Sequence, residues 1–449
     1  MIIERIKSIV LLVLVSLSLL LTYQLWYGQK PTHLIVEEEF ERVVVEKPRP
    51  LVEVITPAYI VLRTEIGLNV LKESDPGFYL LWKTLSQQLQ SLTEEFIVEE
   101  NIPGEGLTNL LTVYLQPALP VGSDLPWLPG IPSAMIGQIE LFSLNELTWL
   151  ALADSEDDTK TYLLLPPEKA VELTDLIAEI SAEDRIVYAL LSTDKLNGLA
   201  ERELNLENSI YLPQEPVYMD YLILRSETLD RDLLLRTFFI DYKLARIIEE
   251  KDGGLIYTDG ERGLRLTNVG LEYSYPRLET GQTTISYPDA LENSSSLISY
   301  HGGWPVGLRL EGLDMIRRGL AVSYQANWRT YHEGYPLYIN KPTRAIFNDR
   351  GLIHYTRTLF VVENEVTDNE ERLPVAEWSI ALQAALDYFD AVNPGNQSGL
   401  RLEEMELGYV LTRSANLIQA EPVWVFQING LQFFLKAADL DLLSREELL

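Results

Sequence analysis

The sequence predicts an α+β fold, with a single N-terminal transmembrane helix followed by a multi-domain extracytoplasmic region of antiparallel sheets with packed helices. Three observations support this prediction. The chain opens on a long apolar run without charge. Beyond it, segments with helical periodicity alternate with strand–turn–strand patterns. At 449 residues the chain exceeds one ordinary core, so two or three domains are expected.

The apolar run predicts an uncleaved membrane anchor. Arg5 and Lys7 precede the uncharged residues 8–26, and about 20 residues of helix rise ~30 Å, enough to cross the hydrocarbon core of a bilayer. Tyr23 and Trp26 suit an aromatic belt at the outer end. A cleaved signal peptide is the rival interpretation, but bulky residues stand where a peptidase prefers small ones. We therefore expect a single-pass protein of the cell membrane, with a cytoplasmic N-terminus and most of the chain outside.

The remaining chain divides into a tether and three predicted domains. Pro48 and Pro50 disfavour helix in the charged segment that follows the anchor, which indicates a tether. Changes in pattern then place the domain boundaries. The predicted ranges are 1–28 for the cytoplasmic tail and anchor, 29–50 for the tether, 51–205 for the N-terminal ectodomain, 206–288 for the central ectodomain and 289–449 for the C-terminal ectodomain.

Apolar residues at helical spacing predict the main helices. "DPGFYLLWKTLSQQLQSL" begins near Asp75 with Pro76 in its first turn, and "PPEKAVELTDLIAEI" follows the same logic from Pro166. "AEWSIALQAALDYFD" predicts a third helix in the last domain. Helical periodicity also extends over "DRDLLLRTFFIDYKLARIIEE" in the central domain.

Two turn dipeptides predict hairpins. Asp259-Gly260 lies between the apolar runs of "LIYTDGERGLRL", and Asn429-Gly430 lies between two alternating runs near the C-terminus. The first stretch also holds Arg262 and further charged residues, which fit an acid–base cluster or an anion clamp as well as a hairpin. Because no histidine, cysteine or second motif accompanies it, we predict that Asp259, Gly260, Arg262, Asn429 and Gly430 are structural turn residues.

Composition and missing motifs argue against several functions. The chain has 36 Lys+Arg against 67 Asp+Glu, and this acidic excess disfavours nucleic acid as a partner. It has no cysteine and only four histidines, none of them spaced as a metal-binding pair. No nucleophile elbow or phosphate-binding loop is present. We therefore predict a non-enzyme with no catalytic, cofactor-binding or metal residues and no cofactor.

Several segments together resemble the YycH family. The anchor, then "FFIDYKLARIIEE…LIYTDGERGLRL…LEYSYP", then "EPVWVF" carry the resemblance, whereas residues 30–205 are assigned by position only. The resemblance implies three α+β domains outside the membrane, the last of them YycI-like. It also implies a regulator of the sensor histidine kinase WalK/YycG, partnered by a YycI-like protein, in the two-component system that controls cell-wall homeostasis.

One stripe of the predicted anchor could dock on other membrane helices. Leu11, Val15, Ser18, Thr22 and Trp26 share this face, and small hydroxyl residues four apart favour close helix packing in lipid. We predict that the face binds the helices of the kinase, although hydroxyl residues are tolerated anywhere in such helices. Two other functions stay open from the sequence: a tethered module that binds a cell-wall ligand and, less favoured, a cell-wall hydrolase.

Overall fold

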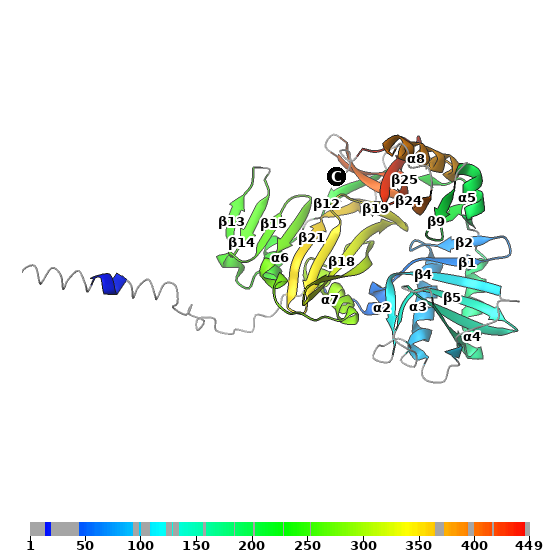
Figure 1. Ribbon diagram of the computed structural model, residues 1–449, viewed down its shortest axis with the longest axis horizontal. Coiled ribbons are helices and arrows are strands. Elements are labelled where there is room, and N and C mark those ends of the chain that lie inside the picture. Colours follow the sequence, from blue (N-terminus) through cyan, green and yellow to red (C-terminus); the bar gives the residue numbers. More distant parts are fainter. Residues whose placement is uncertain are drawn as a thin grey trace, which may run out of the picture. The chain divides into compact units, whose positions relative to one another are not determined.

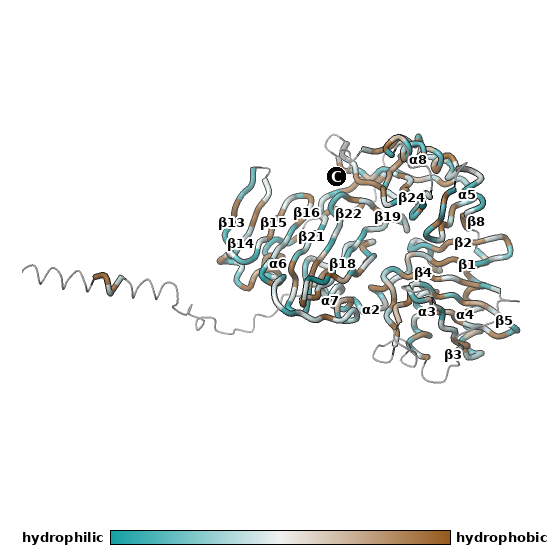
Figure 2. The backbone as a smooth tube through the Cα atoms, in the orientation of Figure 1, coloured by the Kyte–Doolittle hydropathy of each residue, from teal (hydrophilic) through white to brown (hydrophobic). Residues whose placement is uncertain are grey.

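The computed structural model describes residues 14–18, 45–92, 98–99, 108–122, 128, 134–155, 159–183, 185–200, 203–227, 229–251, 253–363, 372–393, 399–414 and 417–444. The chain divides into two compact units, Met1–Val43 and Val44–Leu449. In the first unit, residues 14–18 are helical and exposed, and Figure 2 shows them as a mainly hydrophobic segment. All other elements belong to the second unit, which is α+β and rich in sheet.

The first part of the second unit is built on a nine-stranded sheet in which all neighbouring strands are antiparallel. Alternation of apolar and polar residues explains the strands, because one face of each strand is buried. From edge to edge the order is β10 (Tyr211–Pro213), β8 (Val187–Leu190), β2 (Leu68–Leu71), β1 (Pro57–Arg63), β4 (Thr108–Val121), β5 (Ala134–Leu144), β6 (Leu147–Asp154), β7 (Lys160–Leu164) and β3 (Val98–Glu99).

Two helices cover this sheet and confirm their sequence patterns. They are α3 (Pro76–Ser91) and α4 (Pro167–Ser181), which lie side by side in Figure 1. Each has a proline in its first turn, where the missing N–H breaks no helical hydrogen bond. The predicted apolar face of α3 is buried, and its Trp82 donates from Nε1 to the carbonyl of Ile55 at 3.1 Å. Shorter helices at either end of this region are α2 (Leu51–Val54) and α5 (Thr193–Ala200).

The second part is built on a fifteen-stranded sheet. Its neighbours are antiparallel except for β24 with β19 and β24 with β9. The main path runs β13 (Arg246–Glu249), β14 (Leu255–Thr258), β15 (Gly263–Leu266), β16 (Gly270–Ser274), β21 (Gly351–Thr358), β20 (Thr343–Asn348), β18 (Ala321–His332), β19 (Tyr335–Tyr338), β24 (Leu400–Ser414), β25 (Leu417–Ile428), β12 (Leu222–Ser226) and β22 (Phe360–Glu363). Three strands branch from it: β17 (Leu308–Arg318) on β18, β26 (Leu431–Lys436) on β25 and β9 (Leu204–Leu206) on β24.

This sheet is continuous across residue 288, where the sequence places a domain boundary. β16 of the predicted central domain pairs with β21 of the predicted C-terminal domain, from Gly270 opposite Thr358 to Ser274 opposite His354. The chain also crosses between the sheets near residue 205, since β9 joins the second sheet and β10 the first. The division into three domains stays a prediction.

Helices α7 (Tyr287–Tyr300) and α8 (Trp378–Val392) accompany the second sheet, and α8 matches its predicted pattern. A small sheet pairs β11 (Tyr218–Met219) with β23 (Leu373–Pro374).

The helical pattern predicted over residues 230–250 is wrong beyond Phe238. There α6 (Arg231–Phe238) ends. A short 3-10 turn follows at Tyr242–Leu244, and Arg246–Glu249 form the strand β13. Pairing with β14 makes Arg246–Glu249 a strand, because tertiary context overrides a short periodic signal. A further 3-10 turn lies at Pro276–Glu279.

A buried ion pair joins the two sheets. The guanidinium of Arg309 on β17 contacts the carboxylate of Glu73, which follows β2, with an Nε–Oε2 distance of 2.6 Å. The Arg309 side chain is 7% exposed, and its Nη1 also donates to the carbonyl of Pro57 at 3.4 Å. This pair links the segment after β2 to β17, the strand whose Glu311 lines the cleft described below.

Candidate functional site

The predicted docking face of the anchor lies mostly outside the described residues. Val15 and Ser18 belong to the helical residues 14–18, where both are exposed. Leu11, Thr22 and Trp26 fall outside the described part of the chain. Among the described residues, no helix has the length and apolar character that a bilayer crossing requires. The docking face stays a prediction.

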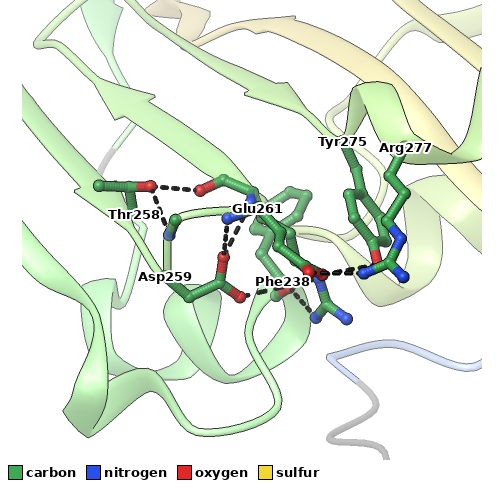
Figure 3. Close-up of polar contacts among 8 residues, drawn as sticks. Phe238, Thr258, Asp259, Glu261, Tyr275 and Arg277 are labelled. Carbon is green, nitrogen blue, oxygen red and sulfur yellow. Dashed lines mark hydrogen bonds and ion pairs between the residues drawn. The ribbon is translucent and has the colours of Figure 1, made fainter. Parts of the chain in front are cut away.

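The stretch around Asp259 is the turn between β14 and β15 (Figure 3). The Asp259 carboxylate accepts from the backbone N–H groups of Glu261 at 2.9 Å and Arg262 at 2.8 Å. The Thr258 hydroxyl donates to the carbonyl of Arg262 at 2.7 Å, and it accepts from the N–H of Gly260 at 3.0 Å. Gly260 has a φ of +94°, which glycine adopts without steric cost. These side chains satisfy the turn's own backbone.

The charged residues of the turn bind neighbouring parts of the same sheet. Arg262 donates from Nη1 to the carbonyl of Phe238 at 3.2 Å, and its guanidinium lies 4.8 Å from the ring centre of Tyr275. Glu261 pairs with Arg277 at 2.5 Å (Figure 3). These contacts tie the hairpin to α6 and to the segment after β16. These contacts hold the hairpin against its neighbours as a framework element.

The Asn429-Gly430 turn joins β25 to β26. Asn429 and Gly430 have φ values of 48° and 75°, the positive pair that a type I′ turn requires. The Asn429 side chain accepts from the N–H of Arg401 at 2.8 Å. The Gly430 N–H donates to the carboxylate of Glu403 at 2.9 Å. The turn is therefore held to β24, and Gly430 also lines the cleft between the two sheets.

This cleft is the strongest candidate site in the described part of the chain. Its volume is about 1020 Å³, which is at the upper end of the range of small-molecule sites, and such sites favour the junctions between domains. One wall comes from the nine-stranded sheet and the other from β17, β18 and β24. Its principal polar and aromatic lining residues are Tyr59, Lys72, Tyr114, Tyr211, Glu311, Arg329, Tyr331, Tyr335, Glu404 and Glu406.

The cleft is not apparent from the sequence because its residues are spread along most of the chain. Only one local signal points to it. Glu404 and Glu406 are two apart in "RLEEMELGYV", and residues two apart on a strand face the same side of the sheet. That pattern alone also fits a solvated strand face. The opposite wall becomes apparent only in the folded chain.

The floor of the cleft is a network of charged and phenolic groups. Glu404 and Glu406 line the cleft, and both contact Tyr338 on β19, which is not a lining residue: its hydroxyl lies 2.8 Å from a carboxylate oxygen of each. Arg329 on β18 pairs with Glu311 at 2.9 Å. The Tyr331 hydroxyl donates to the other oxygen of Glu311 at 2.7 Å.

Burial shifts the charge states of this floor. Burial, followed by the neighbouring Glu404 carboxylate, raises the pKa of Glu406 to about 8. Burial also lowers the pKa of Lys72, against the opposing attraction of Glu406 and Asp75. The Lys72 ammonium lies 3.7 Å from the ring centre of Tyr335, a cation–π contact. Strongly shifted groups gathered in a cleft are typical of a functional site.

Three tyrosines form the opposite wall. The rings of Tyr59 on β1 and Tyr114 on β4 lie 4.6 Å apart, and the ring of Tyr211 on β10 meets both edge-on. The hydroxyls of Tyr114 and Tyr211 are 2.7 Å apart. Burial raises the pKa of Tyr59 and Tyr211 above the usual value, so their phenols stay protonated at neutral pH. The wall offers flat rings together with hydrogen-bonding hydroxyls.

The cleft gathers polar and ionisable side chains. Within the described ranges, no three His, Asp or Glu residues are grouped to hold a metal ion. The groups that converge are carboxyls, phenols, the ammonium of Lys72 and the guanidinium groups of Arg329 and Arg401, both of which are ion-paired. Such groups bind a polar or charged ligand by hydrogen bonds and charge.

Two family models match the chain. The model of the YycH protein N-terminal domain matches residues 4–96, and that of the C-terminal domain matches residues 207–438. The crystal structure of YycH from Bacillus subtilis covers 87% of this chain and 98% of its own, with a TM-score of 0.57 and 12% identity. The C-terminal domain of YpeB from Bacillus megaterium, at 15% identity, covers 50% of this chain and 99% of its own, but its TM-score of 0.29 is too low to support a shared fold. No curated protein matches the chain.

Proposed function

The chain belongs to the YycH family, and from this premise we propose that it is a membrane-anchored regulator of a sensor histidine kinase of the WalK/YycG type. The family match at both ends of the chain carries the proposal, since membership implies a regulatory role in the WalK/YycG system. We further propose that it acts outside the cytoplasm, together with a YycI-like protein, in the control of cell-wall homeostasis, and that it is not an enzyme.

The proposed mechanism starts in the membrane. In lipid, helices associate by close packing and hydrogen bonds, for which small hydroxyl residues are suited. The face of Leu11, Val15, Ser18, Thr22 and Trp26 would pack on the kinase helices and favour one of two signalling states. A coupling free energy of about 1–3 kcal/mol is sufficient, because it changes an equilibrium by roughly five-fold to more than a hundred-fold.

Co-purification from native membranes tests the partnership. The protein is tagged at its C-terminus and solubilised gently, beside a version whose residues 1–28 are replaced by an unrelated anchor. We expect a histidine kinase and a YycI-like protein with the native anchor, and less of both with the foreign one. If neither version recovers a kinase, the proposed partnership is wrong.

A paired substitution tests the docking face. Replacing Ser18 and Thr22 together by leucine should weaken kinase recovery, because both hydroxyls and the close approach are lost. Ser16→Leu is the matched control, since Ser16 points to another side of the same helix. Equal recovery from all three proteins would contradict a role for this face.

The cleft favours a second candidate function, the tethered module that binds a cell-wall ligand. Its polar lining and its volume of about 1020 Å³ suit a small ligand. Binding of such a ligand would stabilise the protein by mass action. A thermal-shift screen with wall fragments tests this function without the kinase.

A further inference from the structure

We propose that the cleft between the two sheets binds the ammonium group of a peptide, with Glu404 and Glu406 as its anchoring carboxylates and the tyrosine wall as its platform. The inference goes beyond kinase regulation and does not depend on it. It specifies the ligand chemistry of the second candidate function, a positively charged amino group on a short peptide.

Tyr338 contacts both carboxyls of the proposed anchor. Its hydroxyl lies 2.8 Å from Glu404 and 2.8 Å from Glu406. A phenol has one hydrogen to donate, so it satisfies only one of the two carboxylates. The second short contact is favourable when one carboxyl itself carries a proton. Such a proton neutralises one of the two carboxylates when no ligand is bound, and Glu404 and Glu406 line the cleft where a ligand cation would replace it.

Negative charges outnumber positive charges around Glu406. The charged groups that face it are Glu404 on the same strand, Arg329 on β18 and Lys72 after β2. The phenols that face it are Tyr338, Tyr331 and Tyr59. Glu311 neutralises Arg329, which leaves two carboxyls, Glu404 and Glu406, against the single ammonium of Lys72. One negative charge is therefore unbalanced, and it is met by either a proton or one monovalent cation.

The walls of the cleft supply aromatic rings and hydrogen-bonding groups. Tyr59, Tyr114 and Tyr211 present a cluster of rings and hydroxyls to the cleft, and aromatic faces attract cations and pack on the flat amide groups of a peptide. The Lys72 ammonium, which lies over the Tyr335 ring, can donate to a peptide carbonyl. The cleft thus offers carboxyls for the ammonium of a lysine-containing peptide, an ammonium for one of its carbonyls and aromatic faces for its amide groups.

Isothermal titration of the full chain in detergent tests the proposal. The probe is the capped tripeptide acetyl-Ala-Lys-Ala-amide, and the control is its norleucine analogue, which has the same chain without the charge. We expect the lysine peptide to bind at least about ten-fold more tightly, equivalent to ~1.4 kcal/mol. Equal binding of the two peptides, or no heat from either at millimolar concentration, would overturn the proposal.

Proton release gives a second readout. Below about pH 8 the carboxyl pair must lose its proton to receive the cation, so binding should release a proton and strengthen as the pH rises. Titration in two buffers of different ionisation enthalpy measures this release. A lysine peptide that binds without proton release at about pH 6 would show that its cation lies elsewhere.

Glu406→Gln separates loss of binding from loss of fold. Glutamine keeps the shape and removes the unbalanced charge, so the variant should melt at or above the parent temperature and bind the lysine peptide at least about ten-fold more weakly. Glu279→Gln, which removes an exposed carboxylate paired with Arg318, is the matched control and should bind normally. Normal binding by Glu406→Gln would refute the proposed anchor.

Discussion

Arg357→Ala should lower the free energy of unfolding of the Val44–Leu449 unit by about 3–5 kcal/mol, because it leaves a buried charge without its partner. The Arg357 side chain on β21 is 1% exposed. Its Nη2 contacts both carboxylate oxygens of Glu227, at 3.2 and 2.9 Å. Its Nη1 donates to the carbonyls of Gly303 at 2.8 Å and His301 at 3.3 Å. The substitution therefore leaves one carboxylate and two carbonyls without this donor.

An exposed arginine, Arg277, serves as the comparison for the free-energy cost of removing Arg357. Arg277 also pairs with one glutamate, Glu261, but the two side chains are 69% and 45% exposed. Solvent screens such a pair, so Arg277→Ala should cost about 0–1 kcal/mol. The two substitutions remove the same side chain, so the difference between them measures the burial of the Arg357 pair together with its two hydrogen bonds to backbone carbonyls.

Urea unfolding of the full chain, followed by circular dichroism, measures both variants. The shift of the midpoint multiplied by the slope gives the change in free energy. Adding Glu227→Gln to Arg357→Ala should recover part of the loss, because the unpaired carboxylate becomes neutral. If Arg357→Ala and Arg277→Ala differ by less than about 1 kcal/mol, or if Glu227→Gln recovers nothing, the buried pair does not have the role assigned to it.

Three further predictions concern the cleft and the turns. Folding raises the pKa of Glu406, so the contribution of this carboxyl to the free energy of unfolding is fully present at low pH and is lost as the pH rises to about 8. Glu406→Gln should therefore make the melting temperature depend less on pH between about pH 5 and 8. Gly307→Ala should destabilise far more than Gly260→Ala in thermal melts, because an added Cβ at Gly307 would lie 2.1 Å from the carbonyl oxygen of Tyr331, whereas at Gly260 it meets open space. Asn429→Ala should cost about 1–2 kcal/mol in urea unfolding, since alanine tolerates the φ of 48° poorly and loses the side-chain hydrogen bond.

Elements with a strong local signal were predictable from the sequence. The helix α3 was predictable because Pro76 in its first turn and apolar residues at helical spacing are local patterns, although burial of that apolar face supplies most of its stability. The turns at Asp259-Gly260 and Asn429-Gly430 need positive φ, which few residues other than glycine and asparagine tolerate. Segment 239–250 was not predictable in this way, because its pairing with β14 outweighs a helical pattern without strong caps.

The candidate site was not predictable, apart from the shared face of Glu404 and Glu406. Sequence spacing places these two carboxyls on one side of β24, but it does not show that Tyr338 lies between them. Nor does it show that Lys72, from another sheet, lies close enough to affect their charge.

The sequence by itself determined the acidic charge, the local helices and turns and the membership of the YycH family, because these depend on composition, short-range geometry and matching segments. Only the tertiary structure decided which strands share a sheet and which side chains meet in the cleft. Strand pairing joins residues far apart in the chain, as where β16 pairs with β21 across residue 288. The pKa of Glu406 likewise depends on burial and on neighbours that folding brings together.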